Sequence, residues 1–331
     1  MNKPLVDSYG RLHTNLRISI TDRCNIRCFY CMPDENIRFK PRHEILTFEE
    51  IQRIVRIVAS RGVNKLRITG GEPLLRADLP ELIAQLVATS GITDVALTTN
   101  GVLLAEQATA LREAGLHRLN ISLDTLKEET FQQISRRTGL QRVLDGIQAA
   151  QNAGFDKIRL NAIAIAGLTE AEIVPLGHFA REHKMELRFI EFMPLDADNA
   201  WKTELVLPGS EIRRRLEEEF GALVASDRPD PSQPAMDYEF ADGGGRIGLI
   251  NPVSEPFCQD CNRLRITAEG KLRNCLFSTV EWDARELLRG SGSDEEISDL
   301  LDACLADKKA SHGIDEEGFQ RPDRAMYQIG G

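Results

Sequence analysis

The chain has 331 residues, a formal net charge of −10 and a pI of about 5.3, which argues against a general nucleic-acid-binding surface. Charged residues make up 28% and hydrophobic residues 42%, as in an ordinary globular protein with a sizeable core. No run approaches the roughly 18 apolar residues that a membrane span needs, and the N-terminus lacks a basic-then-apolar signal pattern, so we expect a cytoplasmic protein without a membrane partner.

Short apolar runs alternate with amphipathic segments as far as Pro194. The predicted strands are residues 16–21, 65–69, 94–98, 117–123, 157–165 and 186–191. The predicted helices are residues 48–59, 79–88, 105–113, 141–152 and 170–183. Two of these helices are expected to begin with a capping box, Thr47 to Glu50 and Thr169 to Glu172. This order predicts a parallel α/β sheet, and six repeats suit an incomplete (β/α)6 barrel of the TIM type better than an eightfold one.

The alternating pattern ends before the C-terminal third of the chain. A charged helix is expected over residues 210–220, followed by a polar linker over 226–234. We therefore divide the chain into a barrel of residues 1–225 and a C-terminal region of residues 226–331. That region contains a second cysteine group and a helical part, and its tail is expected to be extended.

The first cysteine group has the spacing Cys-x3-Cys-x2-Cys and consists of Cys24, Cys28 and Cys31. It follows the first predicted strand, at the end of the barrel that carries chemistry in such folds. Three thiolates can hold three irons of a cubane cluster and leave the fourth iron open to an outside ligand. The alternative is a structural zinc site, which would want a fourth protein ligand. The spacing, with Tyr30 before the third cysteine, resembles the pattern of the radical SAM superfamily.

The second predicted strand ends in Gly-Gly-Glu-Pro at residues 70–73. A lone Gly-Gly pair would indicate only a turn. Here it resembles a superfamily motif whose backbone and carboxylate receive the amino group of S-adenosylmethionine (SAM). Because glycine has no Cβ, a ligand can approach the main chain closely.

Four predicted strands carry one arginine between two apolar residues. Because side chains alternate between the two faces of a strand, these arginines are expected to point into the barrel. Unpaired buried charges cost several kcal/mol, and Glu191 and Asp124 are the only evident acids near the strand ends. A polyanionic ligand such as a triphosphate would compensate them, since Arg binds phosphate through two parallel hydrogen bonds. The alternative is that some of them are solvated at strand edges. The four are Arg17, Arg67, Arg159 and Arg188.

The second cysteine group has the spacing Cys-x2-Cys-x13-Cys and consists of Cys258, Cys261 and Cys275. A zinc ribbon would need another Cys-x2-Cys pair, so a second cubane with an open iron is the natural alternative. The run 263–265, Arg-Leu-Arg, places an anion-binding surface beside it. The seventh cysteine, Cys304, lies in an apolar helical pattern and is expected to be a core residue.

Several motifs together resemble the GTP 3′,8-cyclases, the molybdenum cofactor biosynthesis protein A family. They lie in order along the chain at residues 21–33, 69–73, 98–101, 120–124, 188–194, 257–265 and 330–331. The resemblance implies a barrel whose mouth is closed by a C-terminal extension, two [4Fe–4S] clusters and SAM. The first cysteine group would bind the SAM cluster, and the second would bind an auxiliary cluster whose open iron contacts guanine.

The resemblance also implies which residues contact the ligands. SAM would be contacted by Tyr30, Gly71, Ser122 and Met193. GTP would be contacted by Arg17, Arg67, Thr98, Arg159, Arg188, Arg263, Leu264 and Arg265. The family often has Lys at the position of Arg159, so the charge is kept while the hydrogen-bond geometry differs. The tail, Gly330 and Gly331, would enter the pocket, whereas the residues alone would suggest a frayed terminus.

The implied reaction is a radical cyclisation, catalysed by a lyase of molybdenum cofactor biosynthesis. A 5′-deoxyadenosyl radical from SAM takes the hydrogen from C3′ of GTP, and C3′ then adds to C8 of guanine. One further electron and a proton give (8S)-3′,8-cyclo-7,8-dihydroguanosine 5′-triphosphate. Partners would be an external one-electron donor, a downstream enzyme of the pterin pathway and a second copy of the chain in a dimer.

Two other functions remain open from the residues alone. A radical SAM peptide maturase can also carry auxiliary clusters, but the inward arginines argue against it. A non-catalytic iron–sulfur electron carrier or nucleotide-binding module has no need of open iron positions or of the Gly-Gly-Glu-Pro turn.

Overall fold

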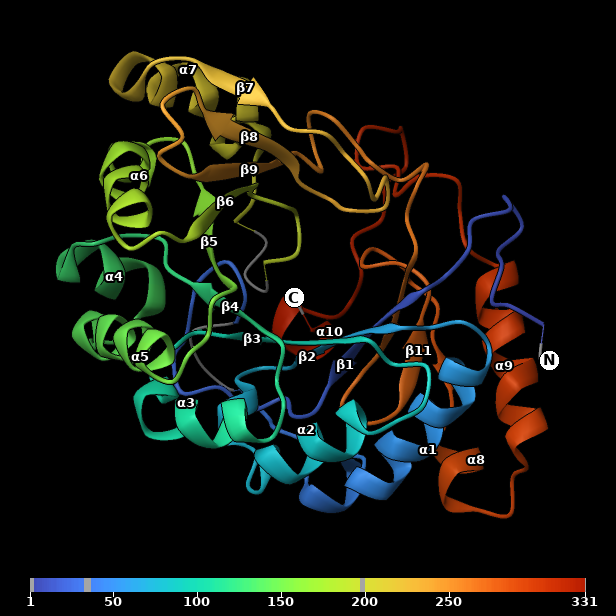
Figure 1. Cartoon of the computed structure of the whole chain (residues 1–331). Coiled ribbons are helices and arrows are strands. Elements are labelled where there is room, and N and C mark those ends of the chain that lie inside the picture. Colours follow the sequence, from blue (N-terminus) through green and yellow to red (C-terminus); the bar gives the residue numbers. More distant parts are fainter. Residues whose placement is uncertain (1–2, 33–36, 197–199, 331) are drawn as a thin grey trace.

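The computed structural model describes residues 3–32, 37–196 and 200–330. Six parallel strands that neighbour one another in chain order form the centre of its sheet (Figure 1). They are β1 (Asn15–Ser19), β2 (Lys65–Thr69), β3 (Asp94–Thr99), β4 (Arg118–Ser122), β5 (Ile158–Ala164) and β6 (Glu186–Glu191). The sheet curves into an open barrel, which confirms the predicted incomplete (β/α)6 architecture. Among the described residues, no helix combines the length and apolar character needed to cross a membrane.

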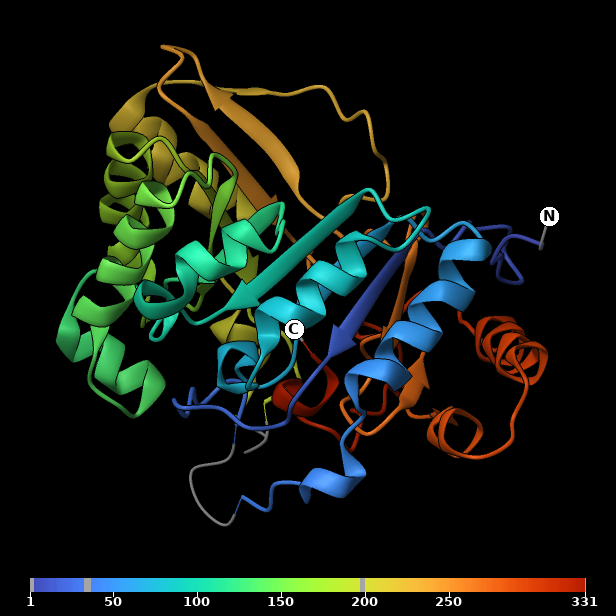
Figure 2. The ribbon, with the colours of Figure 1, turned by 60° about the horizontal axis from the view of Figure 1, so that its bottom comes forward.

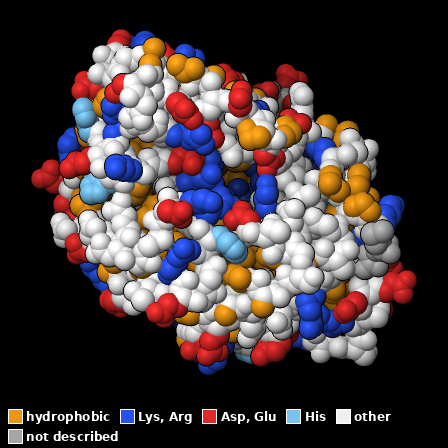
Figure 3. All heavy atoms as spheres, in the orientation of Figure 1, with side chains coloured by type: hydrophobic (Ala, Val, Ile, Leu, Met, Phe, Trp, Pro, Cys, Tyr) orange, Lys and Arg blue, Asp and Glu red, His pale blue; other side chains and the backbone are white. Residues whose placement is uncertain are grey.

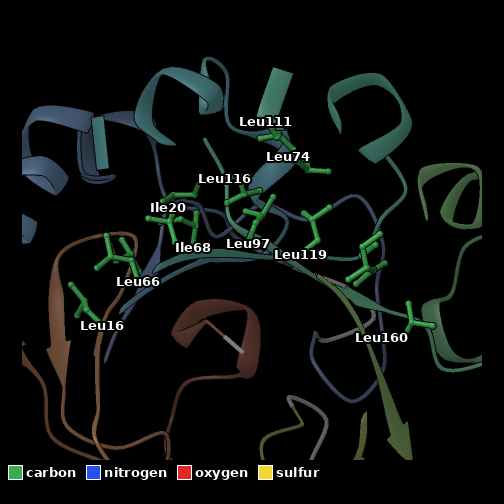
Figure 4. Packing of buried hydrophobic residues seen from close by; sticks show 14 of the residues in the cluster. Leu16, Ile20, Leu66, Ile68, Leu74, Leu97, Leu111, Leu116, Leu119 and Leu160 are labelled. Carbon is green, nitrogen blue, oxygen red and sulfur yellow. The ribbon is translucent and has the colours of Figure 1, made fainter. Parts of the chain in front are cut away.

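Helices cover the convex outer face of this sheet (Figure 2). They are α1 (Phe48–Ser60), α2 (Leu79–Val87), α3 (Leu104–Glu113), α4 (Glu128–Ser135), α5 (Leu140–Asn152) and α6 (Ile173–Glu182). Figure 4 shows Leu16, Leu66 and Leu119 pointing from the strands toward these helices, and all three are at most 1% exposed. Because side chains alternate along a strand, the residues between them face the concave side.

The helix starts show which local predictions were right. At α1 the predicted capping box is present, because the Thr47 hydroxyl accepts from the Glu50 amide at 3.3 Å and the Glu50 carboxylate accepts from the Thr47 amide at 2.7 Å. The second predicted box is wrong. The Thr169 hydroxyl accepts from the amide of Ile165 at 2.8 Å. The Glu172 carboxylate instead accepts from the Thr125 hydroxyl at 2.9 Å. Residues 170–172 form a short 3-10 turn before α6, and α4 was not predicted.

The C-terminal part of the chain extends the sheet at both of its edges. β9 (Arg246–Ile250) pairs in parallel with β6, and β10 (Arg263–Ile266) pairs in parallel with β1. The outer strands are β7 (Leu223–Ala225), β8 (Met236–Phe240), β11 (Lys271–Arg273) and β12 (Trp282–Asp283). The remaining helices are α7 (Gly209–Phe220), α8 (Arg285–Arg289), α9 (Asp294–Ala306) and α10 (Met326–Ile329). The predicted division of the chain at residue 225 stays a prediction.

The C-terminal tail returns to the concave side of the barrel. α10 lies there (Figures 1 and 4), although the tail was predicted to be extended. Its Tyr327 and Ile329 are buried. Because a helix this short is not stable by itself, packing of these side chains stabilises it.

Candidate functional site

The first cysteine group lies in the loop that follows β1, and the loop after β2 supports it. The amide of Gly71 donates to the carbonyl of Thr21 at 2.8 Å, and the amide of Glu72 donates to that of Arg23 at 2.7 Å. A Cβ on Gly71 would collide with the Arg23 carbonyl and come within 2.9 Å of the Asp22 carbonyl. The glycine is therefore required for the two loops to pack, in addition to any approach by a ligand.

Glu72 of the same motif is 1% exposed and holds neighbouring loops together. Its carboxylate accepts from the Thr99 hydroxyl at 2.7 Å and from the Asn100 amide at 2.8 Å. Burial raises the pKa of Glu72 to about 7. These contacts favour a supporting role for the carboxylate, whereas the backbone of Gly70 and Gly71 lines the central cavity.

The three sulfurs of the first group line this cavity. Burial, and then the charge of Glu72, raise the pKa of Cys24 to about 11, so iron binding would have to displace protons, as metal binding at thiols does. Among the described residues, no three His, Cys, Asp or Glu side chains are arranged to hold a single metal ion. A cubane places each thiolate on a different iron, so three spaced cysteines fit a cluster.

The residues named above as SAM contacts line the same cavity, which has a volume of about 250 Å³. They are Tyr30, Gly71, Ser122 and Met193. The Tyr30 hydroxyl donates to Asp124 at 2.8 Å, and the other oxygen of Asp124 accepts from the Ile163 amide at 2.7 Å. Asp124 therefore fixes the orientation of Tyr30, and burial raises the pKa of both groups, that of Asp124 to about 6.

Arginines from β1, β2, β6 and β10 also line the cavity. Arg17 lies level with Arg67 on β2 and with Arg265 on β10, and all three line the cavity with Arg188 and Arg263. Burial, and then the neighbouring arginine charges, lower the pKa of Arg17 and Arg67, and that of Arg265 to about 9. Figure 3 shows Lys and Arg side chains in the central hollow of the molecule. The cluster of like charges is suited to an anionic ligand.

Two of the predicted arginines have a counter-ion in the protein. Glu186 forms ion pairs with Arg188 and, at 2.8 Å, with Arg159, its neighbour in the β5–β6 register. The sequence prediction missed Glu186, although it stands two residues before Arg188 and therefore shares its strand face. The described residues that line the cavity do not include Arg159 or Leu264. Leu264 is fully buried beside Leu16 on the outer face of the sheet.

The second cysteine group surrounds a smaller cavity of about 70 Å³ that adjoins the first. The two cavities share Met193, Pro252, Phe257, Arg263, Arg265 and Leu276. The Arg263 guanidinium lies 3.2 Å from the Cys261 sulfur and 4.9 Å from the centre of the Phe257 ring. Burial alone would raise the pKa of Cys261, but the charges of Arg263 and Lys308 lower it to about 6. This thiol is therefore readily ionised as an iron ligand.

The two cysteine groups lie toward opposite ends of neighbouring parallel strands. Cys24 follows the end of β1, and Cys261 precedes the start of β10. A five-residue strand is roughly 17 Å long, so a ligand between the groups would lie over the paired Arg17 and Arg265.

The tail closes one side of this space. Gly330 is buried with a φ of +81°, and its carbonyl accepts from the Arg265 guanidinium. A Cβ at this position would collide with the Ser19 hydroxyl and lie 2.6 Å from a Thr69 methyl group. Gly331 lies outside the described residues.

Polar atoms in the cavity lining are suited to contact a polar ligand. Within the described part of the chain, Arg17 Nε and the Thr98 hydroxyl are buried and have no hydrogen-bond partner, and both residues line the cavity. Buried polar groups are normally paired, so these atoms are consistent with a polar ligand in the cavity.

Family models match two adjoining parts of the chain. Residues 18–180 match the radical SAM superfamily, and residues 185–314 match a family described as Molybdenum Cofactor Synthesis C. Radical SAM proteins use SAM and a [4Fe–4S] cluster, and the chemistry of the first cysteine group fits that use. The second group, with its three thiols, fits a further cluster in the same way.

Solved structures agree on the fold. The chain resembles Streptococcus suis SuiB with a TM-score of 0.62 and 17% identity, over 92% of this chain and 69% of that one. It also resembles the AdoMet-bound anSMEcpe, with a TM-score of 0.57 and 14% identity, over 90% and 78% of the two chains. At such identities the likeness shows the fold alone.

Much closer relatives carry one name, GTP 3′,8-cyclase. The protein of that name from Rhodopirellula baltica is 52% identical over 99% of this chain and 92% of its own length. The one from Streptomyces coelicolor is 43% identical over 99% and 96% of the two chains. The chain therefore belongs to the GTP 3′,8-cyclase family, within the radical SAM superfamily.

Proposed function

We propose that this protein cyclises GTP to (8S)-3′,8-cyclo-7,8-dihydroguanosine 5′-triphosphate, an early step of molybdenum cofactor biosynthesis. The observation that carries the proposal is the meeting of two three-cysteine groups at joined cavities lined with arginines. The name shared by relatives at 43–52% identity supports the same activity.

The first cysteine group is proposed to hold the SAM cluster through Cys24, Cys28 and Cys31. When bound there, cluster and SAM supply a carbon-centred radical that can remove the C3′ hydrogen of GTP. Tyr30, held by Asp124, would form a fixed wall for SAM together with Gly71, Ser122 and Met193. Such fixed side chains hold the reacting atoms in register and exclude water.

The second group, Cys258, Cys261 and Cys275, is proposed to hold the auxiliary cluster, beside which guanine would lie. Arg17 and Arg67 would bind the triphosphate, because among the described residues neither guanidinium forms an ion pair that would have to be displaced. Further contacts are proposed from Thr98, Arg188, Arg263 and Arg265. Arg159 would act from a distance through Glu186, and Leu264 only through its backbone.

Partners and location are inferred from the same chemistry. The reaction consumes electrons, so an external one-electron donor is required, and a downstream enzyme of the pterin pathway would take the cyclic product. Six partly buried free cysteines must stay reduced to bind iron, which favours the cytoplasm. A dimer remains a prediction, which light scattering of the purified protein would test.

The test is an assay in the absence of oxygen. The protein is reconstituted with iron and sulfide and given SAM, GTP and dithionite, and chromatography measures 5′-deoxyadenosine and GTP. We expect both to change together and Cys24→Ala to abolish both. Cys304→Ala is the matched control, because it also removes a cysteine, but one that lies in the apolar core.

The outcomes separate the candidate functions. If 5′-deoxyadenosine forms while GTP is untouched, the protein is a radical SAM enzyme with another substrate, such as a peptide. If neither reaction occurs with both clusters intact, the catalytic proposal fails and a nucleotide-binding module is the better description.

A further inference from the structure

We propose that Lys308 is a positioning residue for the second cluster, holding the Cys261 thiolate and joining the two chain segments that supply Cys261 and Cys275. The inference rests on the proposed function only in assigning a cluster to these cysteines.

The ammonium of Lys308 is buried and fully paired. The residue is 4% exposed, and its Nζ lies 3.5 Å from the Cys261 sulfur, 3.2 Å from the Arg263 carbonyl and 2.5 Å from the Asn274 carbonyl. An ammonium has three N–H donors, so these acceptors match its full capacity. Burying an ammonium is costly unless a negative charge accompanies it. Of the three acceptors, the sulfur carries that charge when it ligates iron.

The same contacts join segments that are separate in the chain. Asn274 immediately precedes Cys275, while Cys261 lies just before β10 and Arg263 is the first residue of β10. The Asn274 side chain donates to the Cys304 carbonyl in the last turn of α9 at 2.8 Å, and the Lys308 amide donates to that of Leu305 at 3.1 Å. The end of α9 therefore fixes both the lysine and the segment before Cys275.

The two cysteine groups differ in the donors that contact their sulfurs. At the first group, the amide nitrogen of Asn100, a neutral donor, lies 3.7 Å from the Cys24 sulfur. At the second group, Cys261 receives two cations, from Arg263 and Lys308. Hydrogen bonds and positive charge at cluster sulfurs stabilise the reduced state. Lys308 is therefore expected to raise the reduction potential of the second cluster.

The experiment is a potentiometric titration of the reconstituted holoprotein, followed by electron paramagnetic resonance. The first-cluster signal, identified by its response to added SAM, serves as the internal reference. In Lys308→Met we expect the reduced-to-oxidised ratio of the second cluster at a fixed potential to fall about tenfold, or ~59 mV for one electron. Its iron should also pass faster to a chelator. Lys309→Met, at the exposed neighbouring lysine, should leave both readings at the wild-type values.

A second variant keeps the test decisive if Lys308→Met does not fold. Lys308→Gln retains an N–H donor without charge, and we expect its second-cluster potential to fall while its iron is retained longer than in the Met variant. Wild-type potential and wild-type iron release in the variants that fold would overturn the proposal. A wild-type protein that leaves GTP unchanged would refute the proposed function, yet the potential shift would still decide the role of Lys308.

Discussion

Replacing Gly330 by alanine tests whether the buried tail takes part in catalysis. The backbone there has φ +81° and ψ 107°, and left-handed backbone costs a non-glycine residue about 1–2 kcal/mol. The new methyl group would also collide with Ser19 and Thr69. If the tail leaves, it loses the bond from the charged Arg265 to the Gly330 carbonyl, and such a bond contributes about 1.5–3 kcal/mol.

The backbone cost and an overpacking cost of about 1–3 kcal/mol from the collision together weaken tail docking by about 2–5 kcal/mol, a factor of roughly 30 to a few thousand in the docking equilibrium. We expect a fall in kcat/KM for GTP, because Arg265 loses its anchor beside the substrate. The global unfolding free energy should change little, since the tail is terminal. Limited proteolysis with mass spectrometry reports the released tail, and GTP consumption reports the activity.

Gly154→Ala is the matched control, because Gly154 has φ +84° and a methyl group added there would meet nothing within 4 Å. It carries the backbone cost without the collision. If the tail of Gly330→Ala stays as resistant to protease as that of the wild type and kcat/KM is kept within twofold, the steric argument is refuted.

Three further predictions concern other parts of the chain. Thr47→Ala removes the cap of α1 and should lower the unfolding free energy by about 1 kcal/mol in denaturant titrations, while Thr47→Ser should keep it. Arg67→Leu should raise the KM for GTP roughly 10- to 100-fold through loss of a charge-assisted bond, with SAM cleavage as the internal reference. Burial, and then the charge of Lys308, lower the pKa of His13 from 6.5 to about 4. The folded state therefore favours the neutral ring, and about 3 kcal/mol of stability, present above pH 6.5, is lost as the pH falls toward 4. His13→Gln should lack this part of the pH dependence in denaturant titrations of the apoprotein.

Each of these predictions has an outcome that contradicts it. Equal stability of the alanine and serine variants at position 47 would show that the cap contributes nothing. An unchanged KM in Arg67→Leu would remove this arginine from the triphosphate site. The same loss of stability in acid with and without His13 would assign that loss to other groups.

Local patterns allowed the central strands to be predicted closely. The predicted ranges 65–69 and 186–191 coincide with β2 and β6, because a strand buried on one face shows its alternation within a few residues. The capping box of α1 was also predictable, because its two residues, Thr47 and Glu50, lie within one turn of the chain. Thr169 and Glu172 have the same spacing, but other partners compete for both: the backbone amide of Ile165, just after β5, for the threonine, and the distant hydroxyl of Thr125 for the glutamate.

The cysteines of the site were predictable from the sequence, but the residues that hold the cysteines and arginines in place were less so. Cysteine spacing identified both groups, since a cluster needs several thiolates from a short segment. Lys308 gave no comparable signal, because its contacts with Cys261 and Asn274 exist only once α9 has packed. Glu186 could have been found from its shared face with Arg188, whereas its pairing with Arg159 depends on the β5–β6 register.

The pairing of β1 with β10 affects how the protein is made. Thr14 and Asn262, joined by a side-chain hydrogen bond at the start of these strands, are 248 positions apart. On the ribosome, the outer edge of β1 is synthesised early and finds its partner only after most of the chain has emerged. An unpaired strand edge is a template for association with other chains, and contacts this distant in sequence form late. A chain that stops before β10 would therefore keep an unpaired edge of β1, to which other chains can bind. The solubility of the protein thus depends on completion of its synthesis.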